Sequence, residues 1–155
     1  MKTLLIGANG FTGRRILQHL SLCGGYELTG CSLHKDIHPE SNTHFVQADI
    51  NDHPAIGRLI GEMRPDVVIN ASALSVPDYC ESHHEEAHAA NVLAVENMAR
   101  CCEQEGSRFI HLSTDFVFDG KNRSLYIEED IPAPVNYYGL SQYQGEFGVA
   151  AICSN

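Results

Sequence analysis

Three glycines spaced three residues apart are the first feature of this sequence that could do chemistry. Gly7, Gly10 and Gly13 follow a short apolar run at residues 3–6 and open a segment with helical spacing of its apolar side chains. Such a turn lets backbone approach a pyrophosphate, and the N–H groups at the helix start attract its negative charge. The alternative is an ordinary loop. The context favours a nicotinamide dinucleotide site, contacted by Gly7, Asn9, Gly10, Phe11, Thr12 and Gly13.

The end of the second predicted strand, at residues 26–33, indicates which dinucleotide is preferred. An acidic side chain there would bind the adenosine ribose hydroxyls of NAD, whereas basic groups favour the extra phosphate of NADP. This sequence has serine and basic side chains there and no acid before Asp36. We expect NADP to be preferred, and NAD is the alternative if these charges are ordinary surface groups. The residues expected at the adenosine end are Arg14, Ser32, His34, Lys35, Asp49 and Ile50.

A second motif, H-E-x-x-H, could bind zinc. His84 and His88 would share one side of a helix, with Glu85 as the general base of a metalloprotease. The alternative is an ordinary helix start, since Glu81, Glu85 and Glu86 suit the positive end of a helix dipole. The order of strands and helices is also wrong for a zinc protease, so we expect no metal.

The elements that must position these groups alternate between strand and helix. Strands are predicted at residues 3–6, 26–33, 45–48, 66–71 and 108–113, and helices at residues 12–22, 54–63, 85–103 and 138–151. This order predicts right-handed crossovers and an α/β fold, a doubly wound parallel sheet of the Rossmann type. A strand is expected after the last helix, so the chain resembles the front part of something longer.

Four motifs after the fourth strand carry a family resemblance. They are NASA at residues 70–73, STDFVFDG at 113–120, EDIPAP at 129–134 and YGLSQYQGE at 138–146. In that order they resemble the extended short-chain dehydrogenase/reductase family. Within it they are most similar to the dTDP-4-dehydrorhamnose reductases and to the related regulatory beta subunits of methionine adenosyltransferase. The resemblance covers essentially the whole chain.

The resemblance implies roles for individual residues. Thr114, with Ser113 beside it, would polarise the substrate carbonyl, and Tyr138 would donate the proton. The family lysine four residues after the tyrosine is replaced by Gln142. Asn91 matches a family asparagine that helps to order the site. The implied cofactor contacts on this side are Ala71, Ser72, Ala73, Asn91, Ser113, Tyr138 and Gln142.

The glutamine at position 142 changes the expected electrostatics. A free tyrosine has a pKa near 10, so bringing it toward 7 requires about 4 kcal/mol. A single cation about 4 Å away supplies about that much at an effective dielectric constant near 20. Gln142 can still hydrogen-bond a ribose hydroxyl, but it carries no charge. The sequence therefore predicts cofactor binding more firmly than turnover.

Two functions follow from the resemblance. The first is an NAD(P)H-dependent reductase of a nucleotide-linked 4-keto-6-deoxy sugar, an oxidoreductase in which Thr114 binds the carbonyl and Tyr138 donates the proton. The alternative is a non-catalytic NADP-binding regulatory subunit, which Gln142 favours. We expect residues 1–155 to form one NAD(P)-binding domain that stops after the helix following the fifth strand. The C-terminal substrate domain of the family would then be absent from this chain.

Composition narrows the partners. The 155 residues are 43% hydrophobic and carry a formal net charge of −10, which disfavours nucleic acid and anionic membranes. No signal peptide or membrane-spanning stretch is apparent, and the six cysteines are expected as reduced thiols, so we expect a cytoplasmic protein. The expected partner is a small nucleotide sugar, and a homodimer is possible.

Overall fold

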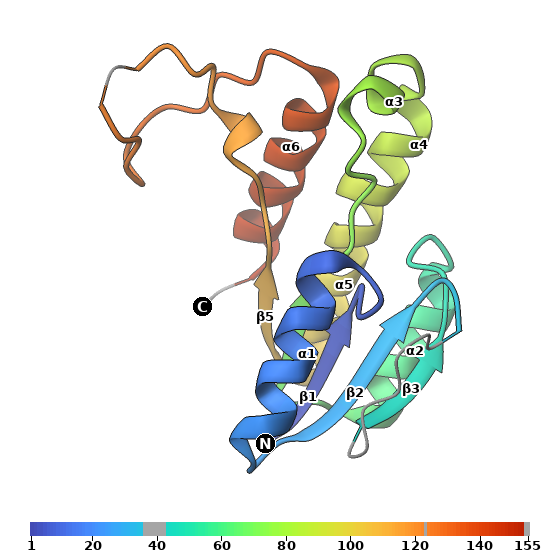
Figure 1. Cartoon of the computed structure of the whole chain (residues 1–155). Coiled ribbons are helices and arrows are strands. Elements are labelled where there is room, and N and C mark those ends of the chain that lie inside the picture. The colour runs from blue at the N-terminus through green and yellow to red at the C-terminus, as the bar shows by residue number, and fades with distance from the viewer. Residues whose placement is uncertain (36–42, 123, 154–155) are drawn as a thin grey trace.

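Five parallel strands form the centre of the structure, a computed structural model that describes residues 1–35, 43–122 and 124–153. The strand order is β3-β2-β1-β4-β5 (Figure 1). In register, Ile6 pairs with Cys31 and with Asn70, and Asn70 pairs with His111, so four strands end at one edge. The strands are β1 (Lys2–Ile6), β2 (Glu27–Ser32), β3 (Thr43–Gln47), β4 (Val67–Asn70) and β5 (Arg108–His111).

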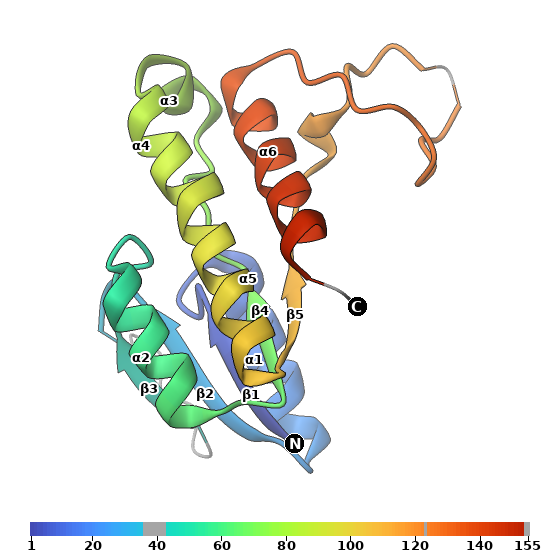
Figure 2. The same cartoon turned by 180° about the vertical axis from the view of Figure 1, so that it is seen from behind.

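Helices lie on both faces of this sheet. Figure 1 shows α1 (Phe11–Cys23) in front of the strands, and Figure 2 shows α2 (His53–Met63), α5 (Ala94–Glu105) and α6 (Tyr137–Ile152) on the opposite side. Because side chains alternate along a strand, β1 contributes side chains to the hydrophobic cores on both faces of the sheet. Leu4 and Ile6 pack in the core that contains α2 and α5, and Leu5 packs in the core beside α1. The predicted doubly wound Rossmann fold is confirmed.

The expected single helix over residues 85–103 is wrong in detail. The segment begins earlier, with the short helices α3 (Pro77–Ser82) and α4 (His84–His88), and continues through a π-helical turn, η1 (Ala89–Leu93), into α5. Pro77 suits a first helical position, where its missing N–H is not needed. The π turn contains Asn91, whose side chain is hydrogen-bonded outside the helix. Apolar spacing alone does not reveal either feature.

Close backbone approach explains where α6 lies. A Cβ atom added at Gly139 would collide with the carbonyl oxygen of Phe116, and one added at Gly145 would collide with that of Asn91. The side chain of Asn136 caps the helix by accepting a 2.8 Å hydrogen bond from the Gly139 N–H. The glycines therefore allow α6 to pack closely against η1 and against the 3-10 turn η2 (Asp115–Val117).

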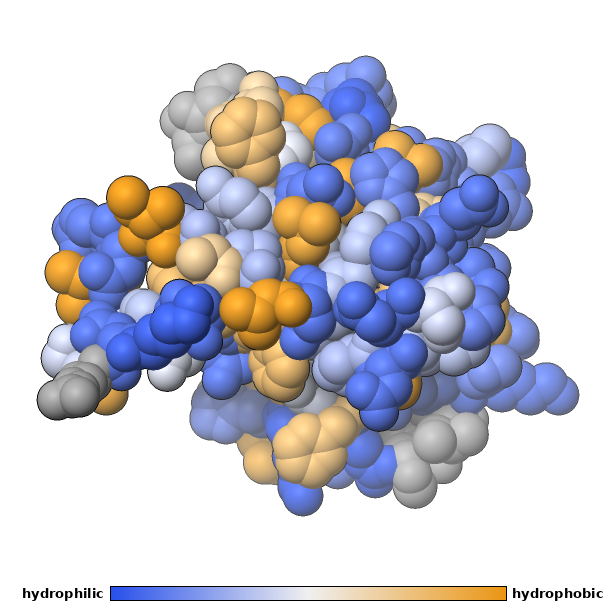
Figure 3. Space-filling model, turned by 90° about the horizontal axis from the view of Figure 1, so that it is seen from above, coloured by the Kyte–Doolittle hydropathy of each residue, from blue (hydrophilic) through white to orange (hydrophobic). Residues whose placement is uncertain are grey.

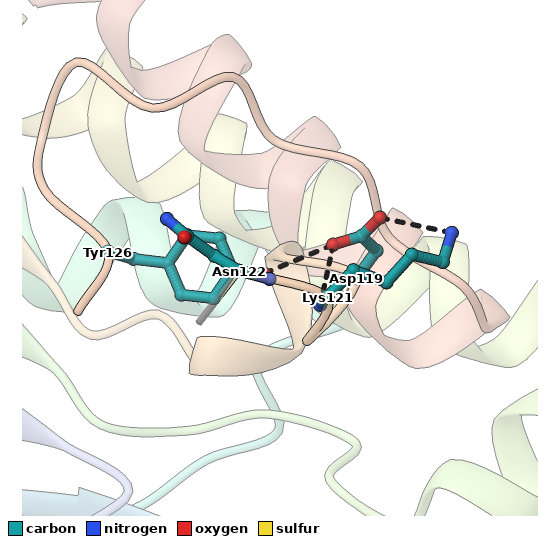
Figure 4. A network of polar contacts seen from close by, with 4 residues as sticks. All are labelled: Asp119, Lys121, Asn122 and Tyr126. Atoms are coloured by element: carbon teal, nitrogen blue, oxygen red, sulfur yellow. Dashed lines mark hydrogen bonds and ion pairs between the residues drawn. The ribbon is translucent and has the colours of Figure 1, made fainter. Parts of the chain in front are cut away.

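The connection between η2 and α6 projects from the body of the molecule in Figures 1 and 2 and is held together by its own contacts. The rings of Phe118 and Tyr126 stack with centroids 4.2 Å apart. The Tyr126 hydroxyl donates to Asp119 at 3.1 Å, and Lys121 forms a 3.1 Å ion pair with the same carboxylate (Figure 4). Hydrogen bonds from Lys121 and Tyr126 hold the pKa of Asp119 below its usual value. The described residues of this connection thus share an internal polar network.

Candidate functional site

A cavity of about 480 Å³ opens at the edge where the carboxyl ends of the strands meet. This is the edge at which open α/β sheets bind ligands. Figure 3 views this end of the molecule and shows apolar residues scattered among hydrophilic ones. The predicted site residues that line the cavity are Gly7, Gly10, Phe11, Thr12, Ser32, Asp49, Ile50, Ala71, Ser72, Ala73, Ser113, Tyr138 and Gln142.

The glycine turn is built as the sequence predicts. Gly7 has φ +83°, a conformation that favours glycine, and its N–H donates to the Cys31 carbonyl at 2.8 Å. A Cβ atom at Gly7 would lie 2.7 Å from the backbone of Ala71, and one at Gly13 would collide with the Gly7 carbonyl oxygen. Gly10 caps α1 without a side-chain hydrogen bond, and no acid lies in the first turn. The helix start therefore offers its backbone N–H groups and positive dipole to an anion in the cavity.

Asn9 supports the turn and does not line the cavity. Its side-chain amide donates to the carbonyl oxygens of His34 at 3.1 Å and Lys35 at 2.8 Å, and its backbone N–H donates to the Ser32 hydroxyl at 3.0 Å. These bonds tie the glycine turn to the segment after β2. Asn9 thereby fixes the edge of the cavity where the adenosine ribose is expected.

The basic residues expected near that ribose are not brought into the cavity. His34 and Lys35 are exposed and Arg14 is half-buried, and all three lie outside the lining set. Ser32 and Leu33 line the cavity instead. Asp36, the first acid after the strand, lies outside the described residues. Of the expected groups at this end, Ser32, Asp49 and Ile50 are at the cavity.

A polar chain runs from the loop after β4 to α6. Asn91 is 1% exposed. Its side chain accepts from the Leu74 N–H at 2.8 Å and donates to the Leu74 carbonyl at 3.1 Å and to the Ser141 hydroxyl at 3.0 Å. The Ser141 hydroxyl donates to the Tyr138 carbonyl at 2.9 Å. Asn91 lies outside the cavity lining. Its hydrogen bonds order the site by connecting the two cavity walls, the loop after β4 and helix α6.

A second buried network, which the sequence did not reveal, supports Ser72. The Asn70 side-chain oxygen accepts from the Ser72 N–H at 3.0 Å, and its amide group lies 3.1 Å from Nδ1 of His111. Because the Asn70 oxygen is already occupied, its N–H must donate to Nδ1, which keeps His111 neutral. Burial lowers the pKa of His111 from 6.5 to about 4. Asn70 stands at the end of the most apolar predicted strand, but its partner lies 41 residues away.

Tyr138 and Gln142 lie one helical turn apart on α6, and both face the cavity. The Tyr138 ring meets Phe116 edge-on, with centroids 5.6 Å apart. Gln142 is 1% exposed, and its Nε2 atom is buried with no hydrogen-bond partner in the structure. No lysine or arginine is found among the described residues that line the cavity. The site therefore has a phenol and an amide but no cation beside them.

The two hydroxyl groups after β5 are both engaged. The Thr114 hydroxyl donates to the Asp115 carboxylate at 3.2 Å and accepts from the Phe116 N–H at 3.3 Å, and Thr114 lies outside the cavity lining. The Ser113 hydroxyl lines the cavity and donates to Glu146, a residue of α6 that sequence reasoning left without a role. Glu146 lies one turn beyond Gln142. Thr114 therefore acts as the cap of η2, and Ser113 is the hydroxyl at the cavity wall.

The H-E-x-x-H residues belong to a different arrangement. His84 and His88 lie on the short helix α4, and the His84 ring stacks on Tyr137. Across the described ranges, no group of three or more histidine, cysteine, aspartate or glutamate side chains is placed to hold a metal ion. The six cysteines are unpaired, and burial raises the pKa of Cys31 to about 11 and of Cys102 to about 12. Those two buried thiols are therefore poor nucleophiles.

Comparison with known proteins agrees with this fold. The chain belongs to the RmlD substrate binding domain family, which matches residues 1–155. It is 37% identical over 150 residues to dTDP-4-dehydrorhamnose reductase of Burkholderia thailandensis, covering 97% of this chain and 46% of that protein. It is 33% identical to methionine adenosyltransferase 2 subunit beta of Rattus norvegicus, covering 96% of this chain and 42% of that protein.

Among solved structures, the chain matches dTDP-4-dehydrorhamnose reductase from Bacillus anthracis str. Ames in complex with NADP. The TM-score is 0.81 at 26% identity, over 97% of this chain and 49% of that one. The resemblance predicted from the motifs is thereby confirmed. The chain spans about half the length of these relatives. In the described part of the chain, no helix is both long and apolar enough to span a membrane.

Proposed function

We propose that this chain binds a nicotinamide dinucleotide, preferably NADP, with the pyrophosphate against the turn from Gly7 to Gly13. The turn supports this because Gly7 and Gly10 line the cavity without side chains, and because α1 begins with uncapped N–H groups beside the cavity. Asp49 and Ile50 line the cavity and would contact the adenosine, and Tyr138 lies on the wall formed by α6. The reductase relative from Bacillus anthracis, described in complex with NADP, supports the same choice.

The observation that carries this proposal is the buried amide of Gln142. Its Nε2 atom is unpartnered in a wall of the cavity, and a buried donor without an acceptor costs about 1–3 kcal/mol. A ribose hydroxyl is an acceptor of suitable chemistry for this group. Because Nε2 is itself shielded from solvent, the Gln142 side chain would have to turn toward the cavity to hold the nicotinamide ribose in the position that the family lysine would occupy.

The reaction proposed is reduction of a nucleotide-linked 4-keto-6-deoxy sugar, as in the dTDP-4-dehydrorhamnose reductases. The reduced cofactor supplies hydride to the keto carbon when bound. Tyr138 donates the proton to the carbonyl oxygen from its place on the cavity wall. Thr114 polarises that oxygen once its hydroxyl turns away from Asp115, and Ser113, already at the wall, lies beside it.

The alternative function is a regulatory subunit that binds the dinucleotide without turnover. Two observations favour it: among the described residues no lysine or arginine lines the cavity wall beside Tyr138, and the relatives include regulatory beta subunits of methionine adenosyltransferase. Both proposals share the cofactor site and differ only in the chemistry at Tyr138.

A reductase assay separates the two. The longest natural form of the chain is incubated with NADPH and dTDP-4-dehydrorhamnose, and the loss of NADPH absorbance is followed beside a Tyr138→Phe variant. The reductase proposal predicts turnover that falls by about 100-fold or more in the variant, because the proton donor is removed. Tight NADPH binding without any turnover in either protein would establish the regulatory alternative.

A further inference from the structure

The first residue of the helix that carries Tyr138 is held by a carboxylate from a distant part of the chain. The Tyr137 backbone N–H donates to the Glu81 side chain at 2.9 Å, across 56 residues of sequence. Tyr137 opens α6, where an N–H has no partner within the helix. A negative charge there also complements the positive end of the helix dipole. Glu81 thus acts as a cap supplied from the end of α3.

A side-chain ring from the junction of α3 and α4 also contacts Tyr137. The imidazole of His84 stacks on the Tyr137 ring with centroids 3.7 Å apart and planes 9° apart. Glu81 and His84 flank the junction of α3 and α4, and both are exposed. The α3–α4 corner, the junction of these two helices, therefore contacts Tyr137 twice, at its backbone N–H and at its ring.

The opposite side of this helix start is fixed as well. Gly139 is buried, and a Cβ atom there would collide with the Phe116 carbonyl oxygen of η2. The Tyr138 ring meets the Phe116 ring edge-on. Tyr138 therefore lies between two anchored neighbours, with the α3–α4 corner on one side and η2 on the other.

We propose that Glu81 and His84 are positioning residues for Tyr138, fixing the first turn of α6 so that the phenol points into the cavity. This accounts for the first histidine of the H-E-x-x-H motif without a metal. The inference rests on the proposed function only for the chemistry assigned to Tyr138. The neighbouring His83 provides a matched comparison, because it stacks on Tyr79 at 3.7 Å within the corner and makes no contact of this kind with α6.

The test combines kinetics with a probe at Tyr138 itself. 3-Fluorotyrosine is placed at position 138, and its fluorine resonance is recorded for the unchanged chain and for Glu81→Ala, His84→Ala and His83→Ala. In the unlabelled proteins, kcat and the NADPH dissociation constant are measured. Glu81→Gln retains a side-chain oxygen that accepts from Tyr137, and His84→Phe retains a flat ring, so these two variants should restore the native behaviour.

We expect Glu81→Ala and His84→Ala each to move or broaden the resonance and to lower kcat about 10-fold, because small displacements of a reacting group carry large rate penalties. NADPH affinity should stay within about twofold, and His83→Ala should resemble the unchanged chain. Glu81→Ala removes no ring, so its effect on the resonance cannot be a lost ring current.

The inference and the proposed function fail in different ways. An unchanged chain without turnover contradicts the reductase proposal alone, since the resonance still reports the position of Tyr138. A native resonance in both alanine variants would overturn the positioning role. An equal change in His83→Ala, or no restoration in Glu81→Gln and His84→Phe, would overturn it as well.

Discussion

Asn91 donates a 3.0 Å hydrogen bond to the Ser141 hydroxyl and so joins the π-helical turn to the helix that carries Tyr138. The same side chain makes two hydrogen bonds to the backbone of Leu74, whose loop lines the cavity. One buried amide therefore connects both walls of the candidate site. The cavity shape depends on a residue that does not touch it.

Removing this amide should weaken both the fold and the site. We expect Asn91→Ala to lower the free energy of unfolding by about 2–4 kcal/mol, because the Leu74 backbone groups lose their partners in a buried place. Asn97→Ala is the matched control, since that side chain makes one 3.3 Å bond to the His53 carbonyl. Urea denaturation of both variants measures the difference, and an equal loss in the two would contradict the role given to Asn91.

Stability should depend on pH through His111. Its folded-state pKa is about 4 against a usual 6.5, so the unfolded chain binds a proton that the folded chain does not between these values. Stability is therefore full above about pH 6.5 and declines as the pH falls toward 4, by up to about 3 kcal/mol. Below pH 4 both states are protonated and this contribution to the slope ends.

Denaturation curves at several pH values check this expectation with two substitutions. His111→Phe should flatten the decline between pH 6.5 and 4, although it also costs the Asn70 amide its acceptor. His44→Gln, at an exposed position on β3, should leave the decline as it is. A His111→Phe profile parallel to that of the unchanged chain would show that another group is responsible.

Much of this arrangement could be predicted from the sequence, because local patterns determine it. The glycine turn, the apolar strands and the order of elements are short-range signals, and the structure has them at the expected positions. The π turn could not be predicted, because the partners of Asn91 lie 17 and 50 residues away. The Asn70–His111 pair depends on strand register in the same way.

Two details of the site also escaped prediction, one through a local hydrogen bond and one through hydrogen bonds between segments 25 and 26 residues apart. Thr114 was expected at the cavity, but its hydroxyl caps the 3-10 turn that follows it. His34 and Lys35 were expected beside the ribose, but Asn9 holds their carbonyl oxygens and their side chains lie outside the lining set. In both cases a hydrogen bond to the backbone decides where the segment runs.

The choice between the two dinucleotides remains testable through those basic groups. We expect NADPH to bind about 5- to 150-fold more tightly than NADH if the side chains of Arg14 and Lys35, which lie outside the cavity lining, reach the added phosphate, since one or two cations near it contribute about 1–3 kcal/mol. Lys35→Ala and Arg14→Ala should narrow the gap, while Arg58→Ala, on α2, should not. Fluorescence titration of each protein with both cofactors gives the ratio, and a preference for NADH would refute the basic-pocket argument.

The substitution Gln142→Lys tests the missing charge. It should raise the rate at neutral pH about 10-fold or more if half of the roughly 4 kcal/mol available reaches the transition state, and lower the apparent pKa of the pH–rate profile. Gln142→Met serves as the uncharged comparison and should weaken cofactor binding only. An unchanged chain that is fully active with a tyrosine pKa near neutrality would contradict the argument. Activity that stays at zero with the lysine would favour the regulatory alternative.

The account depends most on the glycine turn, and calorimetric titration with NADPH tests it directly. The unchanged chain should bind one equivalent, and Gly10→Val should abolish binding, because the added side chain fills the space that the pyrophosphate needs. Gly61→Ala on α2, where a Cβ atom makes only ordinary contact, should bind normally, and circular dichroism should show both variants folded. Native affinity in a folded Gly10→Val variant would show that the dinucleotide, if it binds at all, does not bind at this turn.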